Sequence, residues 1–461
     1  MDQEYLDIID EKAALLENVA NYLWEHPETA FTEYQSAACL CDALRKEGFT
    51  VQEKLAGIQT TFSGTYGSGK PVIGILGEFD ALSGLSQEAG CKEQKSLGGQ
   101  AGHGCGHHLF AAGALGAAIA VKKWLETTGK SGTVVFFGTP GEEGGSGKSF
   151  MARDGVFDGL DAAFTWHPGV ANKLWTDRSL ANYQILYKFD GIPSHASNRP
   201  EVGRSALDAV ELMNVGVQFL REHMPNHCRI HSAITDAGGM SPNVVQPHAE
   251  VLYLIRGADN RTVKALYQRV NDIAKGAALM TSTKESHVFI KACSNLVHNT
   301  VLRKLLHDKL VEVGVPEMTE EEIRTAREFS KAALAEMAGA DPDCPIGDDI
   351  WAYTEAEVQG YSSTDVGDVS WVCPTAQILT ATFAKGTPPH TWQMVAQGKQ
   401  SQAHKMTRYA AKVMAASAVE LMDDPQLLAQ AQEEFRSRVG AGYEAPIPRD
   451  VSPKPMDSFK K

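Results

Sequence analysis

The sequence lacks an uninterrupted apolar run of about 20 residues, the length that a helix needs to cross a lipid bilayer. It also lacks the features of a targeting segment, because the opening Met1–Tyr5 is acidic and is not followed by the apolar core of a signal peptide. We therefore expect a protein with no membrane partner, located in the cytoplasm.

Basic residues are scarce, with 43 lysines and arginines against 57 acidic residues and a net charge of −14. Nucleic acids and anionic membranes attract positive surfaces, so this balance argues against a nucleic-acid partner. The eight cysteines show no secreted spacing pattern, and most should be reduced and buried. With 461 residues, the chain is long enough for two or three domains.

The segment Ala101–His108 (AGHGCGHH) places one thiol and three imidazoles within six positions, separated by glycines that let the backbone fold closely around a cation. Thiolate and imidazole together suit zinc or a similar transition metal. The alternatives are a buried structural cysteine beside surface histidines, or a nucleophilic Cys/His pair.

Further metal-competent side chains follow apolar segments that we expect to be buried strands. Glu78 and Asp80 follow Pro71–Leu76, and Glu142 and Glu143 follow Thr133–Phe137. His167 follows Ala162–Trp166, and His390 follows the strand expected around Ala376–Thr382. Because open α/β sheets place their sites at the carboxyl ends of strands, we expect these side chains to converge.

The resulting set of donors is sufficient for two metal ions that share a ligand, with one carboxylate to spare; it consists of Cys105, His107, Glu142, Glu143, His167 and His390. A two-metal site lowers the pKa of a bridging water and polarises a carbonyl, as amide hydrolysis requires. Taken singly, Glu142-Glu143 is also compatible with a solvated turn, and each histidine with an ordinary surface or core role. Gly147-Lys148-Ser149 is not a phosphate loop, because Glu142 stands where that motif needs glycine.

From Tyr183 to Ala292 the expected elements follow the order β-α-β-β-α-β, which is the ferredoxin-like unit. We predict that this unit is inserted into an α/β domain built on a mixed sheet between two helical layers. The predicted division is 1–181 and 297–444 for the catalytic domain, 182–296 for the inserted domain, and 445–461 for a loosely held tail.

Several motifs carry a resemblance that spans essentially the whole chain. A Cys-Gly-His loop, a Gly-Glu-Glu pair, a strand-end histidine and a C-terminal histidine occur in this order. They accompany the longer motifs GEFDALSGLS, PGEEGGSGK, TWHP, STDVGDVSW and GTPPHTWQ. In these residues the chain resembles the metallopeptidase family that includes aminoacylases, glutamate carboxypeptidases and plant indole-acetyl-amino-acid hydrolases.

The resemblance implies a dinuclear manganese or zinc site whose ligands are Cys105, His107, Glu143, His167 and His390. It implies Glu142 as the catalytic base and Asp80 as a residue that orients a ligand. His108 stands where the family commonly has aspartate, so it alters the surroundings of the ligands and could compete with them.

For the inserted domain, the resemblance implies roles as a lid and a dimerisation unit. His195 would reach the active site of a partner subunit and stabilise the oxyanion, while Asn243 and Arg256 would hold the substrate's amide and carboxylate. A loop-capping role for His195 and an internal salt bridge for Arg256 are the alternatives.

We therefore expect an amidohydrolase that acts on a small N-acyl amino acid, most of all p-aminobenzoyl-glutamate, through a metal-bridging water and Glu142. The nearest alternatives are an aminoacylase, a dipeptidase or an indole-acetyl-aspartate hydrolase. A catalytically silent subunit that supplies its lid to a homologous partner and a metal-regulated binding protein are the others. The expected assembly is a homodimer or a heteromer with a homologous subunit.

Overall fold

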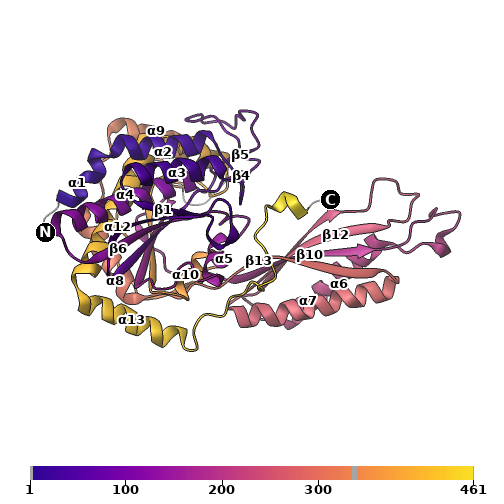
Figure 1. Ribbon diagram of the computed structural model, residues 1–461. Coiled ribbons are helices and arrows are strands. Elements are labelled where there is room, and N and C mark those ends of the chain that lie inside the picture. The colour runs from indigo at the N-terminus through magenta and orange to yellow at the C-terminus, as the bar shows by residue number, and fades with distance from the viewer. Residues whose placement is uncertain (1–3, 335–339, 460–461) are drawn as a thin grey trace.

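The computed structural model describes residues 4–334 and 340–459, and its two main parts are each built on one β-sheet (Figure 1). The larger sheet has seven strands in the order β1-β2-β6-β3-β7-β15-β8. Their bounds are β1 Thr50–Glu53, β2 Phe62–Ser68, β3 Val72–Glu78, β6 Gly132–Thr139, β7 Ala162–Gly169, β8 Lys173–Leu174 and β15 Thr375–Ala381.

The centre of this sheet is parallel and its edges are antiparallel. β3 pairs in parallel with β6 and β7, and β15 pairs in parallel with β7. β1, β2 and β8 add antiparallel pairs at the two edges. All eight residues of β6 are buried, as expected for an apolar strand covered on both faces. The parallel centre brings the carboxyl ends of four strands to one edge of the sheet.

Helices cover both faces of the seven-stranded sheet. On one face, α4 (His107–Thr128) and α12 (Ser401–Asp423) pack against each other and against the strands. On the other face, the short helices α5 (Gly147–Arg153) and α10 (Val366–Ser370) share a core with Leu76, Val135 and Phe137. The predicted mixed sheet between two helical layers is therefore confirmed.

The remaining helices surround this unit. They are α1 Glu4–Glu11, α2 Ala13–Glu25, α3 Tyr34–Lys46, α8 Thr300–Val313, α9 Glu320–Leu334, α11 Trp392–Gln397 and α13 Pro425–Val439. Two small ribbons pair β4 (Leu82–Ser83) with β5 (Ala101–Gly102) and β9 (Asp177–Arg178) with β14 (Val358–Gln359). Among the described residues, no helix combines the length and the apolar composition that a bilayer crossing requires.

The second sheet is antiparallel and projects away from the first (Figure 1). Its strands are β10 Ala181–Asp190, β11 Arg229–Asp236, β12 His248–Gly257 and β13 Lys284–Cys293, in the order β11-β12-β10-β13. The helices α6 (Ala206–Leu220) and α7 (Asn260–Thr281) pack on one face. This arrangement confirms the ferredoxin-like unit, whereas the division of the chain at 182 and 296 stays a prediction.

The C-terminal segment is held more firmly than the sequence led us to expect. Ile447 is buried against the apolar core that includes the second sheet, and the Arg153 side chain donates to the backbone oxygens of Pro448 and Val451 at 3.0 and 2.7 Å. The prediction of a loosely held tail from residue 445 is therefore wrong for this stretch. A proline- and lysine-rich composition did not reveal that Arg153 anchors it.

The contact between α4 and β7 generates a stability prediction. A Cβ added at Gly113 would lie 2.7 Å from the indole of the fully buried Trp166. Overpacking costs about 1–3 kcal/mol, which outweighs the roughly 1 kcal/mol that alanine gains over glycine in a helix. We expect Gly113→Ala to lower the thermal unfolding midpoint.

Gly276 in α7 is the matched control, because a Cβ added there would meet nothing within 4 Å. Gly276→Ala should raise stability by about 0.4–1 kcal/mol, because alanine restricts the unfolded chain. Differential scanning calorimetry of the two variants checks the opposite signs. Equal changes in both variants would refute the steric explanation.

Candidate metal centre and active site

The candidate site lies where the parallel strands of the large sheet end. Glu78 is the last residue of β3 and Asp80 follows it; Glu142 and Glu143 follow β6, and His167 lies near the end of β7. Cys105 and His107 stand at the N-terminus of α4, and His390 belongs to the segment between β15 and α11. The expected convergence of these side chains is thus present in the fold.

Gly106 lets the loop approach the strand ends. Its φ of 79° is left-handed, and a Cβ there would lie 3.0 Å from the Pro168 side chain and 3.1 Å from the Phe383 ring. Glycine meets both the backbone and the steric requirement. The thiol of Cys105 and the imidazole of His107 are thereby brought to the same side as His167.

Potential ligand atoms form three compact groups, within each of which all atoms lie within 4.8 Å of one another. One group is Cys105, His107 and His167, and a second is Cys105, Glu143 and His390. The Cys105 Sγ lies 3.4 Å from His167 Nε2, and Glu143 Oε1 lies 3.0 Å from His390 Nε2. Because both groups contain Cys105, this arrangement fits two neighbouring ions with the thiolate between them.

The third group adds Glu78 and Glu142 to His107. His107 Nε2 is buried and makes no hydrogen bond to the described residues, although Glu78 Oε2 lies 3.1 Å away. A buried imidazole nitrogen without a hydrogen-bond partner is rare in a closed core. A soft and borderline donor set around such an atom fits a transition-metal ligand.

Asp80 fixes two members of this cluster. Its Oδ1 lies 3.0 Å from His107 Nδ1, and its Oδ2 accepts a hydrogen bond from the Glu143 backbone N–H at 3.0 Å. His167 Nδ1 lies 2.8 Å from the Pro168 carbonyl oxygen, which leaves Nε2 directed at Cys105. Such partners set the tautomer and the orientation of ligating histidines.

His108 does not join the cluster. Its Nε2 lies 2.9 Å from the Gly398 carbonyl oxygen, and its buried ring packs against His103 with ring centroids 4.8 Å apart. Successive residues of a helix point in directions about 100° apart, so His107 and His108 face different surroundings. The structure therefore separates His108 from the potential ligands.

A buried ion network beside the cluster escaped the sequence analysis. The Lys148 Nζ lies 2.6 Å from both Glu78 Oε1 and Asp365 Oδ1, and all three side chains are buried. Burial alone would lower the pKa of Lys148, but the carboxylates of Asp365, Glu78 and Glu142 outweigh it and raise that pKa. The strand-end position of Glu78 was the available signal, whereas Asp365 offered none, because it lies 217 residues from Lys148.

The adjacent carboxyl groups of Glu142 and Glu143 differ in their proton affinity. Burial, followed by the charges of Glu78 and Glu143, raises the pKa of Glu142 well above its usual range. Burial also acts to raise the pKa of Glu143, but the His390 and His107 imidazoles outweigh it and lower that pKa to about 2. Two carboxyl groups with diverging pKa values suit separate roles as proton carrier and ligand.

A cavity of ≈ 680 Å³ opens over the cluster and extends to the second sheet. Cys105, Glu142, Glu143, His167 and His390 line its floor, and Arg256 of β12 lines the opposite side. This volume is typical of a small-molecule site. The cluster and Arg256 therefore face the same space.

His195 and Asn243 lie outside this cavity. Both are exposed, and the Asn243 carbonyl oxygen accepts a hydrogen bond from the Ala196 backbone N–H at 2.9 Å. His195 Nδ1 accepts from the backbone N–H groups of Ser197 and Asn198 at 3.3 and 3.2 Å. The structure brings these two residues to each other but not to the metal cluster of the same chain.

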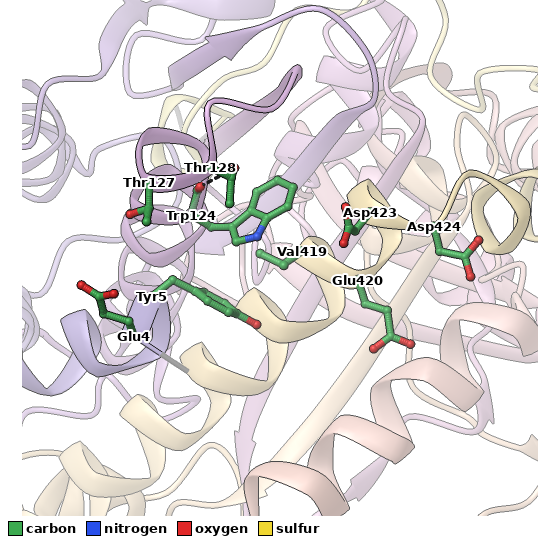
Figure 2. A pocket seen from close by; sticks show the side chains of 9 residues that line it. All are labelled: Glu4, Tyr5, Trp124, Thr127, Thr128, Val419, Glu420, Asp423 and Asp424. Carbon is green, nitrogen blue, oxygen red and sulfur yellow. Dashed lines mark hydrogen bonds between the residues drawn. The ribbon is translucent and has the colours of Figure 1, made fainter. Parts of the chain in front are cut away.

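Another cavity, of ≈ 480 Å³, lies between α1, α4 and α12 (Figure 2). Its lining contains neither histidine nor cysteine. Asp423 pairs with Lys130, and Glu420 pairs with Lys309, so these carboxylates are already neutralised. We assign no chemistry to this cavity.

Comparison with known proteins agrees with the arrangement of the site. The family model described as peptidase family M20/M25/M40 matches residues 75–454. One of the subunits of the p-aminobenzoyl-glutamate hydrolase of Escherichia coli (strain K12) is 46% identical, with 98% of each chain covered. The Xaa-Arg dipeptidase of Mus musculus is 28% identical over 94% of this chain and 91% of its own.

A solved structure supports the fold. The aminobenzoyl-glutamate utilization protein from Klebsiella pneumoniae has a TM-score of 0.60 at 16% identity, covering 89% of this chain and 98% of that one. The metallopeptidase resemblance inferred from the motifs is thus confirmed over most of the sequence. The chain belongs to peptidase family M20/M25/M40.

Proposed function

We propose that this chain hydrolyses the amide bond of an N-acyl or N-aroyl amino acid, most of all p-aminobenzoyl-glutamate, to give p-aminobenzoate and glutamate. The observation that carries this proposal is the convergence of five potential metal ligands and two carboxylates on one cavity. The substrate is inferred from the name of the Escherichia coli relative, which matches this chain over 98% of both lengths.

Cys105, His107, Glu143, His167 and His390 are proposed to hold two divalent ions, manganese or zinc. When bound, such ions polarise the scissile carbonyl and lower the pKa of the attacking water. The thiol and three imidazoles favour a transition metal over calcium or magnesium. The lack of a hydrogen-bond partner for the buried His107 Nε2 supports a ligand role.

Glu142 is the proposed general base. Its side chain lines the cavity and lies next to the ligand groups without belonging to the two groups that share Cys105. It would take a proton from the attacking water and pass it to the leaving nitrogen. Arg256 would bind the substrate carboxylate from the opposite side of the cavity.

His195 and Asn243 are proposed to act on the active site of a second subunit, where His195 would stabilise the oxyanion and Asn243 would hold the substrate's amide. Their separation from the cavity of their own chain supports this arrangement. The partner is a second copy of the chain or a homologous subunit. The latter is favoured because the Escherichia coli relative is named as one of the subunits of its enzyme. We propose a cytoplasmic location.

A dipeptidase is the second candidate, because a 28% identical relative of matching length carries that name. It would use the same ligands and the same base. Comparing turnover of p-aminobenzoyl-glutamate with that of a set of dipeptides separates the two possibilities.

Removal of the base should abolish turnover without removing the metals. We expect Glu142→Gln to lower kcat for p-aminobenzoate release by about 10²–10⁴-fold, the usual contribution of a general base. Metal content by elemental analysis should stay at the wild-type level. Activity within tenfold of wild type would contradict the assigned role.

Loss of the shared thiolate should affect both ions. We expect Cys105→Ala to bind less manganese and zinc than wild type after gel filtration, because the sulfur lies in both ligand groups. His108→Asn is the matched control, since Asn retains a donor for the Gly398 carbonyl oxygen and His108 lies outside the groups. A normal metal content in Cys105→Ala would refute the proposed ligand set.

The action of His195 across subunits can be tested by mixing two inactive variants. His195→Ala and Glu142→Gln chains are mixed under conditions that exchange subunits. About a quarter of wild-type activity should return, because half of the dimers would be hybrids with one complete site each. If His195 acts within its own chain, or if the chain forms no homodimer, no activity will return, and size measurements by light scattering distinguish these two results.

A further inference from the structure

The side of the cavity opposite the metal cluster is formed by the open face of the second sheet. One row of neighbouring residues across β11, β12, β10 and β13 is Arg229, Arg256, Asn182 and Cys293, and all four line the cavity. The next row contributes His231 and Lys291 to the same surface. Neither row contains an acidic residue, so this surface is positive.

Arg229 and Arg256 stand directly opposite each other on adjacent antiparallel strands. Like charges in such positions repel and destabilise the pair. Within residues 4–334 and 340–459, no carboxylate lies within 4 Å of either guanidinium. The repulsion is therefore left uncompensated by the chain itself, which favours an anionic ligand between or beside the two groups.

Both guanidinium groups are held in place by neutral contacts. Arg229 Nη1 donates to the backbone oxygens of Asn226 and Cys228, each at 2.8 Å, and its guanidinium carbon lies 4.8 Å from the centre of the Tyr361 ring. Arg256 Nη1 donates to Ser363 Oγ at 2.7 Å. These contacts fix the positions of the guanidinium groups without neutralising their charge, and donors remain for a ligand.

The other basic residues of this surface are less suited to bind the same ligand. The Lys291 Nζ donates to the Glu143 carbonyl oxygen at 3.4 Å, close to the metal cluster. Burial, and then the charges of Arg256 and Arg221, lowers the pKa of His231, which favours its neutral form. The arginine pair therefore carries the positive charge at the far end of the cavity.

We propose that Arg229 and Arg256 bind the two carboxylates of an acidic amino acid, with the side-chain carboxylate on Arg229 and the α-carboxylate on Arg256. Each guanidinium can bind one carboxylate in a bidentate manner. Residues opposite each other on antiparallel strands have Cα atoms about 5 Å apart, a spacing comparable with that of the carboxylates of glutamate. This inference rests on the proposed function and narrows the substrate class to N-acyl dicarboxylic amino acids.

The pair is tested by binding, so that the result does not depend on turnover. The manganese-loaded Glu142→Gln protein is titrated by calorimetry with p-aminobenzoyl-glutamate and with p-aminobenzoyl-glutamine, which lacks only the second carboxylate. The glutamate conjugate should bind about 10–100-fold more tightly, as hydrogen bonds between charged groups predict. Adding Arg229→Gln should remove most of this preference and leave the glutamine conjugate's affinity unchanged.

The control is Arg261→Gln in the same Glu142→Gln background, because Arg261 is an exposed arginine of α7 that does not line the cavity. It should keep the full preference for glutamate. Equal weakening of both conjugates by Arg229→Gln would indicate a merely structural role and overturn the proposal, as would equal affinities in the parent protein or binding of neither conjugate.

Turnover by the manganese-loaded wild-type protein is measured in parallel with both conjugates. Loss of the glutamate preference in Arg229→Gln, expressed mainly in KM, would support the assignment, because this contact binds ground state and transition state alike. Absence of turnover by wild type together with discrimination in binding would refute the proposed reaction and leave the arginine pair intact.

Discussion

Compensation of buried negative charge is the constraint on which the active-site end of the large sheet depends. Glu78, Asp80 and Asp365 are buried at the strand ends, beside Glu142 and Glu143. A buried carboxylate is costly unless it is paired or hydrogen-bonded. Lys148 lies between Glu78 and Asp365, and Asp80 is held by His107 and by the Glu143 backbone. The remaining carboxylates lie where the proposed metal ions would balance them.

This charge compensation also links the two helical layers to the site. Lys148 belongs to α5, and Asp365 immediately precedes α10, so the ion network joins the two short helices that pack on one face of the sheet. His107 and Cys105 come from the start of α4 on the other face. The ligand geometry consequently depends on elements from both sides of the sheet, and a change in the packing of either layer would displace it.

The cavity is electrically polar, with carboxylates around the proposed metals on one side and uncompensated arginines on the other. A substrate with a neutral amide and terminal carboxylates matches this distribution, because its anionic end is attracted to Arg229 and Arg256 while the carbonyl faces the ligand cluster. The net charge of −14 makes a local positive surface necessary for an anionic substrate. The second sheet provides this surface, whose charge stands out against the acidic remainder of the chain.

The sequence by itself determined the strands, the donor set and the inserted β-α-β-β-α-β unit, because apolar periodicity and local motifs specify elements and their ends. Cys105, Glu142 and His167 could be placed at one edge for this reason. Only the tertiary structure decided that His108 points away, that Lys148 meets Asp365 across 217 residues, and that Arg229 faces Arg256. Those contacts depend on helix rotation, on the packing of distant segments and on strand register, none of which a local pattern specifies.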